Sequence, residues 1–477
     1  MAAAYDIKDL EAWDARIRDK AAEFGLDCYP QEFELCDHFQ MLGAMAYSGM
    51  PSHYPHWSYG KAYERLKTLY DHGVSGLPYE MVINANPSIA YLMRDNSLCL
   101  QILTIAHVYA HNDFFKNNFT FRYLRPELVV RRFKVHADRV RRYVETPSIG
   151  EDKVEALLDA AHALMHQCRR NPAIRKLDRD EQEDWLWRRA EPSPDPFRAV
   201  HKTPEFEAPD LHREPLEPEE DILLFIRDHN PRLAEWQRDV LTMVHEEAMY
   251  FLPQIETKII NEGWASYWHR AILNDLDLPQ DLHMEFLVRH NQVVRPVPGT
   301  INPYHLGLKV WQDIERRVDE PTADERDAFD FGGKTGRQVM FEVREIDRDV
   351  SFLRRFLTAR LMREADLFQH EAQGDERVVT KVADTDNWRE IKETLLRNVG
   401  LGPVPVIKVV DADHDGRRTL FLRHDFDGRE LDPEHAEKTL AHLHRLWGRK
   451  VVLETTVEGR TVHLWADEDG FGQSPCD

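Results

Sequence analysis

The sequence predicts a mainly α-helical large domain followed by a small C-terminal α+β module. Its 477 residues are enough for one large hydrophobic core and a smaller one. Up to about residue 370, apolar residues recur mostly at helical spacing, whereas after about residue 375 short β-like runs end in glycine-containing turns. We therefore expect a helical domain over residues 1–370 and an α+β module over residues 371–477.

The first half of the large domain is expected to contain three helices. These are predicted over residues 9–24, from just after Pro87 to residue 118, and over residues 151–170. Residues 48–73 are rich in aromatic residues, glycine and proline, a composition typical of an ordered loop layer near a site.

The second half begins with a stretch rich in proline and acidic residues at 191–219, which predicts a linker or surface excursion. Pro253 is expected to separate two helices, because proline cannot donate the backbone hydrogen bond that a continuing helix needs. One helix is predicted to begin near residue 219. Four more are predicted over residues 233–251, 254–273, 305–318 and 347–370.

The C-terminal module is expected to contain two hairpins joined by a helix. Residues 403–428 predict two strands with an Asp-Gly turn, and residues 450–467 predict a second pair that turns at Glu458-Gly459. Between them, residues 433–448 begin with proline and end with glycine, as helices often do.

The charge and composition of the chain argue against some classes of function. The net charge of −22 disfavours nonspecific binding to nucleic acid or to anionic membranes. The basic run at residues 131–142 predicts a solvated helix face, with a phosphate-binding patch as the alternative. Because we find neither an apolar run of membrane-spanning length nor a signal-peptide core, we expect a soluble cytoplasmic protein.

The five cysteines form no CxxC pair and are odd in number, which argues against a disulfide framework or a thiolate zinc cluster. A metal in this protein would therefore be expected to use histidine and carboxylate ligands. The FGGKTG string at residues 331–336 lacks the first glycine and the preceding strand of a nucleotide-binding loop, so we reject that interpretation.

The string HVYAHND contains a candidate pair of metal ligands, His107 and His111. Residues four apart lie on one face of a helix, so both rings can point at one ion. In the HExxH zinc motif the second position is the glutamate that acts as general base, but here it is Val108. Asp113 could orient a ligand histidine from the second shell, or it could begin the turn that ends the helix.

The string NEGWASY at residues 261–267 resembles the segment that supplies the third zinc ligand in zinc aminopeptidases and related gluzincins. The resemblance implies that Glu262 is a zinc ligand and that the helical core is distantly gluzincin-like. His269 lies two turns further along the same face. It could be a fourth ligand, a second-shell donor or a substrate contact.

A hydrolase would also need a general base and a group that stabilises an oxyanion. Because HEEAM at residues 245–249 ends in methionine, it does not complete an HExxH motif. Glu246 or Glu247 could still supply the missing base, or both could be solvated helix carboxylates. Tyr267 or His269 is the candidate for the oxyanion.

Long strings of the chain resemble the stage V sporulation protein R (SpoVR) family. The most distinctive are YPHWSYGKAYERLKTLYDHG, IAHVYAHNDFFKNN, EEAMYFLPQIETKIINEGWASYWH, INPYHLGLKVWQDIERR and LWGRKVVLETT. The resemblance implies a role in forming the spore cortex, or a stationary-phase stress role in bacteria without spores. It also implies a PrkA-type serine kinase and a von Willebrand-like protein as partners.

Two functions follow from these observations. The first is a zinc-dependent hydrolase of an amide bond in a cell-wall-related peptide or precursor, with His107, His111 and Glu262 as the zinc ligands. The second is a non-catalytic regulatory or scaffold protein that works with the PrkA-type kinase. The histidine pair and NEGWASY favour the first function, whereas Val108 favours the second.

Overall fold

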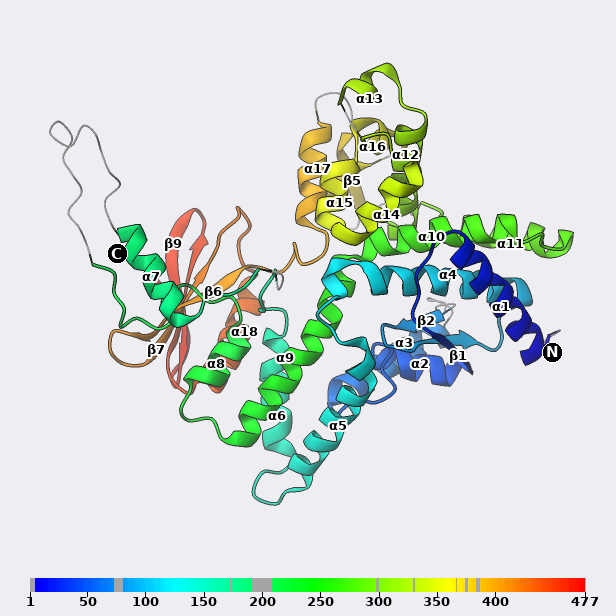
Figure 1. Cartoon of the computed structure of the whole chain (residues 1–477). Coiled ribbons are helices and arrows are strands. Elements are labelled where there is room, and N and C mark those ends of the chain that lie inside the picture. Colours follow the sequence, from blue (N-terminus) through cyan, green and yellow to red (C-terminus); the bar gives the residue numbers. More distant parts are fainter. Residues whose placement is uncertain are drawn as a thin grey trace. The chain divides into compact units, whose positions relative to one another are not determined.

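The structure is a computed structural model of the chain (Figure 1). It describes residues 5–72, 80–171, 174–190, 208–296, 300–328, 331–365, 367–373, 376–382 and 387–476. Contacts divide the chain into two compact units, Met1–Arg141 with Tyr250–Pro403, and Arg142–Met249 with Val404–Asp477. The division differs from the boundary expected at residue 370, because the middle helices group with the C-terminal strands.

The first unit is mainly helical, with a small sheet near its N-terminal end. Its elements up to residue 141 are α1 (Ile7–Glu23), β1 (Gln31–Cys36), α2 (His38–Ala46), α3 (Trp57–Asp71), β2 (Glu80–Ile83), β3 (Ser88–Met93), α4 (Leu98–Asn117), the 3-10 helices Phe119–Phe121 and Pro126–Leu128, and most of α5 (Val129–Glu145). From residue 250 it contains the end of α9 (Glu235–Glu256), α10 (Lys258–Asp275), α11 (Gln280–Val293), α12 (Pro303–Asp319), α13 (Ala323–Ala328), α14 (Gly336–Ile346), α15 (Asp349–Phe356), α16 (Ala359–Glu364), β4 (Phe368–Gln373), β5 (Glu376–Val382) and α17 (Trp388–Arg397).

The helix predicted directly after Pro87 is wrong in its first part. Residues Ser88–Met93 form β3, the central strand of a three-stranded sheet, which pairs parallel to β1 and antiparallel to β2. Alternate residues of β3 are buried, which is the period-2 pattern of a strand. The helix itself, α4, begins at Leu98, where the Ser97 hydroxyl accepts a hydrogen bond from the Leu100 amide (3.3 Å).

The expected loop layer at residues 48–73 is also partly wrong, because Trp57–Asp71 forms α3. His56 caps it, since its Nδ1 accepts a hydrogen bond from the Ser58 amide (3.3 Å). The two prolines that suggested a loop, Pro51 and Pro55, both precede this cap. The first predicted helix is confirmed as α1.

The break between α9 and α10 lies at Thr257 and not at Pro253, which is inside α9. The Thr257 hydroxyl donates to the Pro253 carbonyl (2.6 Å) at the end of α9. The Asp349 carboxylate then accepts hydrogen bonds from the amides of Ile259 and Ile260 (3.0 and 2.8 Å), two of the free N–H groups in the first turn of α10. Asp349 therefore fixes the start of the helix that carries NEGWASY.

The core of the first unit is built on α4, α10 and α12, which pack together in Figure 1. Helices α10 and α12 approach most closely at Gly263 and Gly307. A Cβ atom on Gly263 would lie 2.4 Å from the Cα of Gly307. Around this crossing the indole rings of Trp264, Trp268 and Trp311 are completely buried. The buried faces of α4 and α10 therefore hold their side chains in fixed positions.

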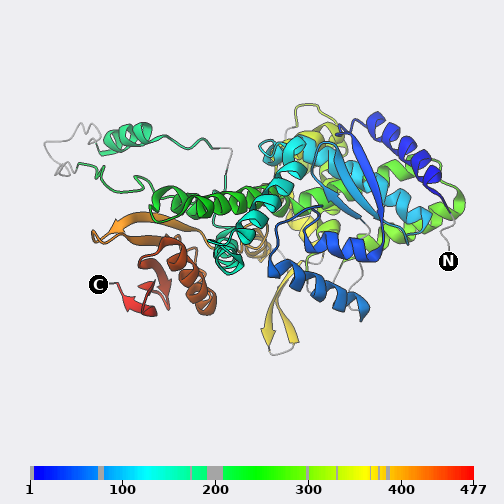
Figure 2. The ribbon, with the colours of Figure 1, turned by 90° about the horizontal axis from the view of Figure 1, so that it is seen from below.

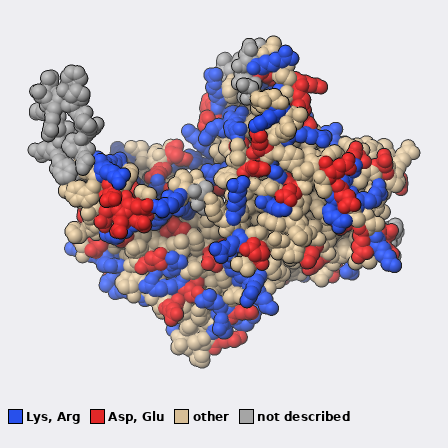
Figure 3. Space-filling view, viewed as in Figure 1, with Lys and Arg blue, Asp and Glu red and all other residues tan. Residues whose placement is uncertain are grey.

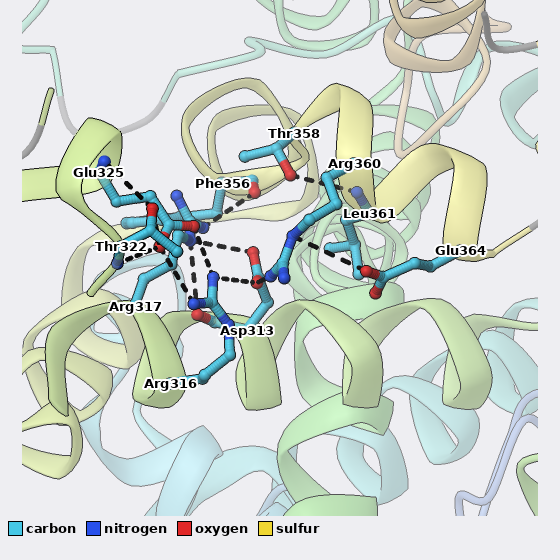
Figure 4. Close-up of polar contacts among 10 residues, drawn as sticks. All are labelled: Asp313, Arg316, Arg317, Thr322, Glu325, Phe356, Thr358, Arg360, Leu361 and Glu364. Carbon is cyan, nitrogen blue, oxygen red and sulfur yellow. Dashed lines mark hydrogen bonds and ion pairs between the residues drawn. The ribbon is translucent and has the colours of Figure 1, made fainter. Parts of the chain in front are cut away.

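A charge network around the buried Asp313 and Arg317 ties α12 to the segments that follow it (Figure 4). Asp313 forms ion pairs with Arg316, Arg317 (2.9 Å) and Arg360. Arg317 also donates to the carbonyl of Phe356 at the end of α15 (3.1 Å). The hydrogen bonds from Arg316 lower the pKa of Glu325 to about 2. The opposite charges within the network compensate one another, so we assign it a structural role.

The single helix predicted over residues 347–370 is instead two short helices, α15 and α16, followed by β4. The Thr358 hydroxyl accepts a hydrogen bond from the Leu361 amide (3.2 Å) and so starts α16. Strands β4 and β5 pair as an antiparallel hairpin, which projects from the helices of this unit in Figure 2.

The second unit combines helices with a five-stranded sheet of order β10-β9-β8-β7-β6. Its complete elements are α6 (Glu151–Leu164), α7 (Arg179–Ala190), α8 (Ile222–His229), β6 (Ile407–His414), β7 (Thr419–His424), α18 (Pro433–Trp447), β8 (Val451–Val457), β9 (Arg460–Asp467) and β10 (Gly470–Pro475). Both predicted hairpins and the helix between them are confirmed, but β10 was missed. Of the predicted linker, residues 191–207 lie outside the described residues, and Glu219 pairs with Val409 of β6.

No helix in the described parts of the chain has the length and apolarity needed to cross a membrane. On the face shown in Figure 3, basic and acidic side chains are interspersed. The net charge of −22 therefore does not form one continuous acidic surface on that face.

Candidate metal centre

The predicted ligands His107, His111 and Glu262 converge in the core of the first unit. The two histidines lie one turn apart on α4, with ring centroids 4.6 Å apart. Glu262 reaches them from α10, and its Oε2 lies 3.6 Å from His107 Nε2 and 3.4 Å from His111 Nε2. The spatial juxtaposition expected from HxxxH and NEGWASY is therefore present.

A second carboxylate, Glu80 at the start of β2, completes the cluster. Its Oε1 lies 3.9 Å from His107 Nε2, and its ligand atom lies within 4.8 Å of those of both histidines. Glu80 was not predicted, because no spacing rule connects a strand residue with a helix that begins 18 positions later. The one available signal was a single acidic residue at the edge of the otherwise apolar run YEMVI.

The second ring nitrogen of each histidine has its own partner. His111 Nδ1 lies 2.9 Å from Asn261 Oδ1, so its N–H is directed to an amide oxygen and its Nε2 lone pair faces Glu262. His107 Nδ1 lies 2.9 Å from His269 Nδ1, and His269 Nε2 lies 2.7 Å from His290 Nδ1. Of the three roles predicted for His269, the geometry therefore fits the second-shell partner.

The pKa values of the two carboxylates, Glu80 and Glu262, are shifted in opposite directions. Burial raises the pKa of Glu80 above its ordinary value, although the neighbouring histidines oppose the shift. Burial would also raise the pKa of Glu262, but the facing imidazoles of His107 and His111 outweigh burial and lower that pKa. Burial disfavours the charged form of His111, yet Glu262 raises its pKa overall. Glu262 is thus the permanent anion of the cluster.

Two atoms in the cluster have unmet bonding capacity. His107 Nε2 and Glu262 Oε2 are buried and have no hydrogen-bond partner among the described residues. Buried polar atoms are normally satisfied, so each such case needs an explanation. A divalent cation between them would satisfy both, and two imidazoles with one carboxylate form a donor set suited to Zn²⁺.

Asp113 does not contact either histidine. Its carboxylate accepts hydrogen bonds from the Asp27 amide (2.8 Å), from Trp264 Nε1 (3.0 Å) and from Arg344 (2.6 Å). Two positions after His111 on a helix, it points away from the histidine face. The second-shell role predicted for Asp113 is filled by Asn261 and His269, and Asp113 instead joins α4 to α10 and α14.

The other predicted catalytic residues have different surroundings. Glu246 and Glu247 lie on the part of α9 that belongs to the second unit. The Tyr267 hydroxyl donates to Glu315 on α12 (2.6 Å), because it lies five positions after Glu262 and so on another side of α10. Besides the candidate ligand Glu262, the carboxylate that the structure brings to the histidines is Glu80, which is therefore the better candidate for the base.

We expect the metal-free protein to lose stability as the pH falls from about 6.5, the ordinary histidine value, towards 4. Burial lowers the pKa of His290 to about 4 and that of His269 well below its ordinary value. Since both values are depressed in the folded state, the unfolded chain binds more protons in this window. The loss is at most about 1.4 kcal/mol per pH unit for each group, and less for the more accessible His290.

Urea denaturation at pH 7, 6 and 5 measures this loss. The His290→Gln variant should show a flatter dependence on pH, because one of the two protonation sites is gone. Equal slopes for wild type and variant would contradict the assignment.

Together, the fold and the cluster define a helical protein with a buried histidine–carboxylate centre. The family described as SpoVR like protein matches residues 4–404, and the family described as SpoVR-like C-terminal domain matches residues 405–458. The chain belongs to the SpoVR family. It is 35% identical over 490 residues to the Escherichia coli (strain K12) protein named Uncharacterized protein YcgB, covering 95% of this chain and 93% of that protein. No solved structure gives a significant match.

Proposed function

We propose that this SpoVR-family protein is a zinc-dependent hydrolase whose metal is held by His107, His111 and Glu262. One observation carries the proposal: two histidine nitrogens and two carboxylates from three separate elements converge, and two of their buried atoms have no hydrogen-bond partner within the described structure. Glu80 lies beside these ligands.

Each residue of the cluster would have a separate role in such a hydrolysis. Glu262 stays ionised and supplies the negative charge that holds a cation. Asn261 and His269 fix the ring orientations of His111 and His107. Glu80, whose pKa is raised by burial, is suited to accept a proton from water at neutral pH. A bound Zn²⁺ would polarise a carbonyl group and acidify water.

The proposed substrate is an amide bond in a cell-wall-related peptide or precursor, since the family is linked to spore cortex formation or stationary-phase stress. A cytoplasmic hydrolase would reach a cell-wall precursor or a recycled fragment, but not the mature cell wall.

Metal analysis of untagged protein tests the site. Wild-type protein reconstituted with Zn²⁺ should hold one equivalent more than either His111→Ala or Glu262→Ala. The matched control is His245→Ala, which removes a histidine paired with Asp221 (2.6 Å) in the second unit and should leave the zinc content unchanged. Equal zinc in wild type, His111→Ala and Glu262→Ala would overturn the proposal.

The alternative is a non-catalytic regulator working with a PrkA-type serine kinase, alone or with a von Willebrand-like partner. It is favoured by the buried Val108, which occupies the position of the HExxH glutamate. Peptide hydrolysis by the zinc-loaded wild type, lost in Glu80→Gln with zinc retained, supports the hydrolase. Zinc binding without hydrolysis, together with direct binding to the kinase, supports the regulator.

A further inference from the structure

A second group of metal-binding side chains lies on the five-stranded sheet, away from the histidine pair in sequence. Glu454 on β8 and His463 on β9 are direct cross-strand neighbours, and Cys476 follows β10. His463 Nε2 lies 3.5 Å from Cys476 Sγ and 3.8 Å from Glu454 Oε2. Strands β8 and β9 and the residue directly after β10 therefore bring one oxygen, one nitrogen and one sulfur donor to a common region.

These separations fit a tetrahedral zinc ion. Zn–S and Zn–N bonds of about 2.3 and 2.0 Å place the two donor atoms about 3.5 Å apart. That is the distance found between Cys476 and His463. The nitrogen and carboxylate oxygen are slightly further apart than about 3.3 Å, the separation that the same geometry gives. A small rotation of the Glu454 side chain would close the difference.

The surroundings hold the donors in place. The other oxygen of Glu454, Oε1, accepts a hydrogen bond from Arg423 on β7 (2.6 Å), its partner in the parallel pair with β8. The His463 ring packs edge-on against Phe421 (centroids 5.6 Å apart). The Cys476 amide donates to the Thr461 carbonyl (3.3 Å), which attaches the segment after β10 to β9. Such outer contacts orient ligands at metal sites.

The same residue types also occur in cysteine nucleophile triads, but the geometry argues against one. In a triad the histidine contacts the cysteine through one ring nitrogen and the orienting carboxylate through the other. Here Cys476 and Glu454 both approach Nε2 of His463. Two groups directed at one nitrogen fit convergence on a shared cation.

We propose that Glu454, His463 and Cys476 form a second Zn²⁺ site, with the fourth position left to water or to an external ligand. The site is independent of the proposed hydrolase centre. It also departs from the expectation that any metal would use only histidine and carboxylate ligands. That expectation came from the lack of CxxC pairs, whereas these ligands come from different strands of one sheet.

Co²⁺ titration of the full-length protein tests this site, because a thiolate ligand gives an intense near-ultraviolet charge-transfer band and the histidine–carboxylate centre gives none. Wild type should develop the band and lose it when Zn²⁺ is added. Cys476→Ser should lack the band, and His463→Gln should bind Co²⁺ at least tenfold more weakly at this site. A wild type without the band, or a band that persists in Cys476→Ser, would overturn the proposal.

Two controls separate this site from the first. His435→Gln changes an exposed histidine of the same unit that pairs with Asp432, and it should keep the band. Glu262→Ala should also keep the band while losing the metal of the hydrolase centre. If one of the two proposed sites does not bind metal, the measurement on the other site can still be interpreted.

Discussion

Replacing Gly263 with alanine is expected to lower the free energy of unfolding by about 3 kcal/mol or more. The added Cβ would lie 2.3 Å from the carbonyl carbon of Gly307 and 2.4 Å from its Cα. Both are backbone atoms, so no side-chain rotation can relieve the overlap. Helices α10 and α12 would have to separate, and the buried Trp264 and Trp311 between them would lose contact.

The denaturant midpoint of the purified variant measures this effect. The matched control is Gly60→Ala in α3, where an added Cβ meets nothing within 4 Å. That change should be neutral or stabilising by up to about 1 kcal/mol, because alanine favours the helix over glycine. An unchanged midpoint for Gly263→Ala would show that the two helices do not approach as described.

The glycine also explains why NEGWASY was informative beyond its resemblance to a zinc motif. Asn261 contacts His111, Glu262 faces the histidine pair, and Gly263 permits the helix crossing. Trp264 then donates to Asp113 on α4. One short string thus carries both the candidate ligand and the contacts that place it.

The site residues that could be predicted from the sequence are those whose positions follow from spacing or motif on a single helix. The pair His107 and His111 follows from a spacing of four, and Glu262 follows from a motif on one helix. Glu80 and His290 were missed because they reach the cluster from β2 and α11 through tertiary packing, which no local pattern encodes. Strand β3 was missed for a related reason, since its six residues SIAYLM form a short apolar run that periodicity alone cannot distinguish from the start of the helix that follows.

The outcomes for Asp113 and Tyr267 show the same limit. Asp113 lies near His111 in the chain but on another face of α4, and Tyr267 stands in the same relation to Glu262 on α10. Proximity in sequence therefore suggested partners that helix geometry rules out. The observed partners, Asn261 and His269, lie more than 140 positions away from the histidines they contact.

Arg344→Met is expected to destabilise the protein by about 3 to 5 kcal/mol at pH 8, because it leaves the Asp113 carboxylate buried without its charged partner. Asp113 is completely buried, and even beside Arg344 its burial raises its pKa to about 6. The Arg344 guanidinium also lies over the Phe341 ring, 4.9 Å from its centroid. Methionine keeps the apolar stem but loses this cation–π contact, so the pH dependence is needed to isolate the charge effect.

The pH dependence identifies the cause. Without Arg344 the folded-state pKa of Asp113 should rise further above its unfolded value. A group with a raised folded-state pKa stabilises the fold at low pH, where it is protonated, and this stabilisation is lost as the pH rises through the folded-state pKa. The stability difference between wild type and Arg344→Met should therefore be smaller at pH 5 than at pH 8, as measured by urea denaturation. A difference that does not vary with pH would indicate lost packing instead.

The control is Arg141→Met, which removes an arginine from an exposed ion pair with Asp138. Exposed pairs contribute little, so this change should alter the free energy of unfolding by less than about 1 kcal/mol at either pH. The contrast separates a buried pair that joins α4 to α14 from a surface pair within one helix. It matters for the metal centre because Asp113, through Trp264, also holds α4 against α10, and these two helices supply His107, His111 and Glu262.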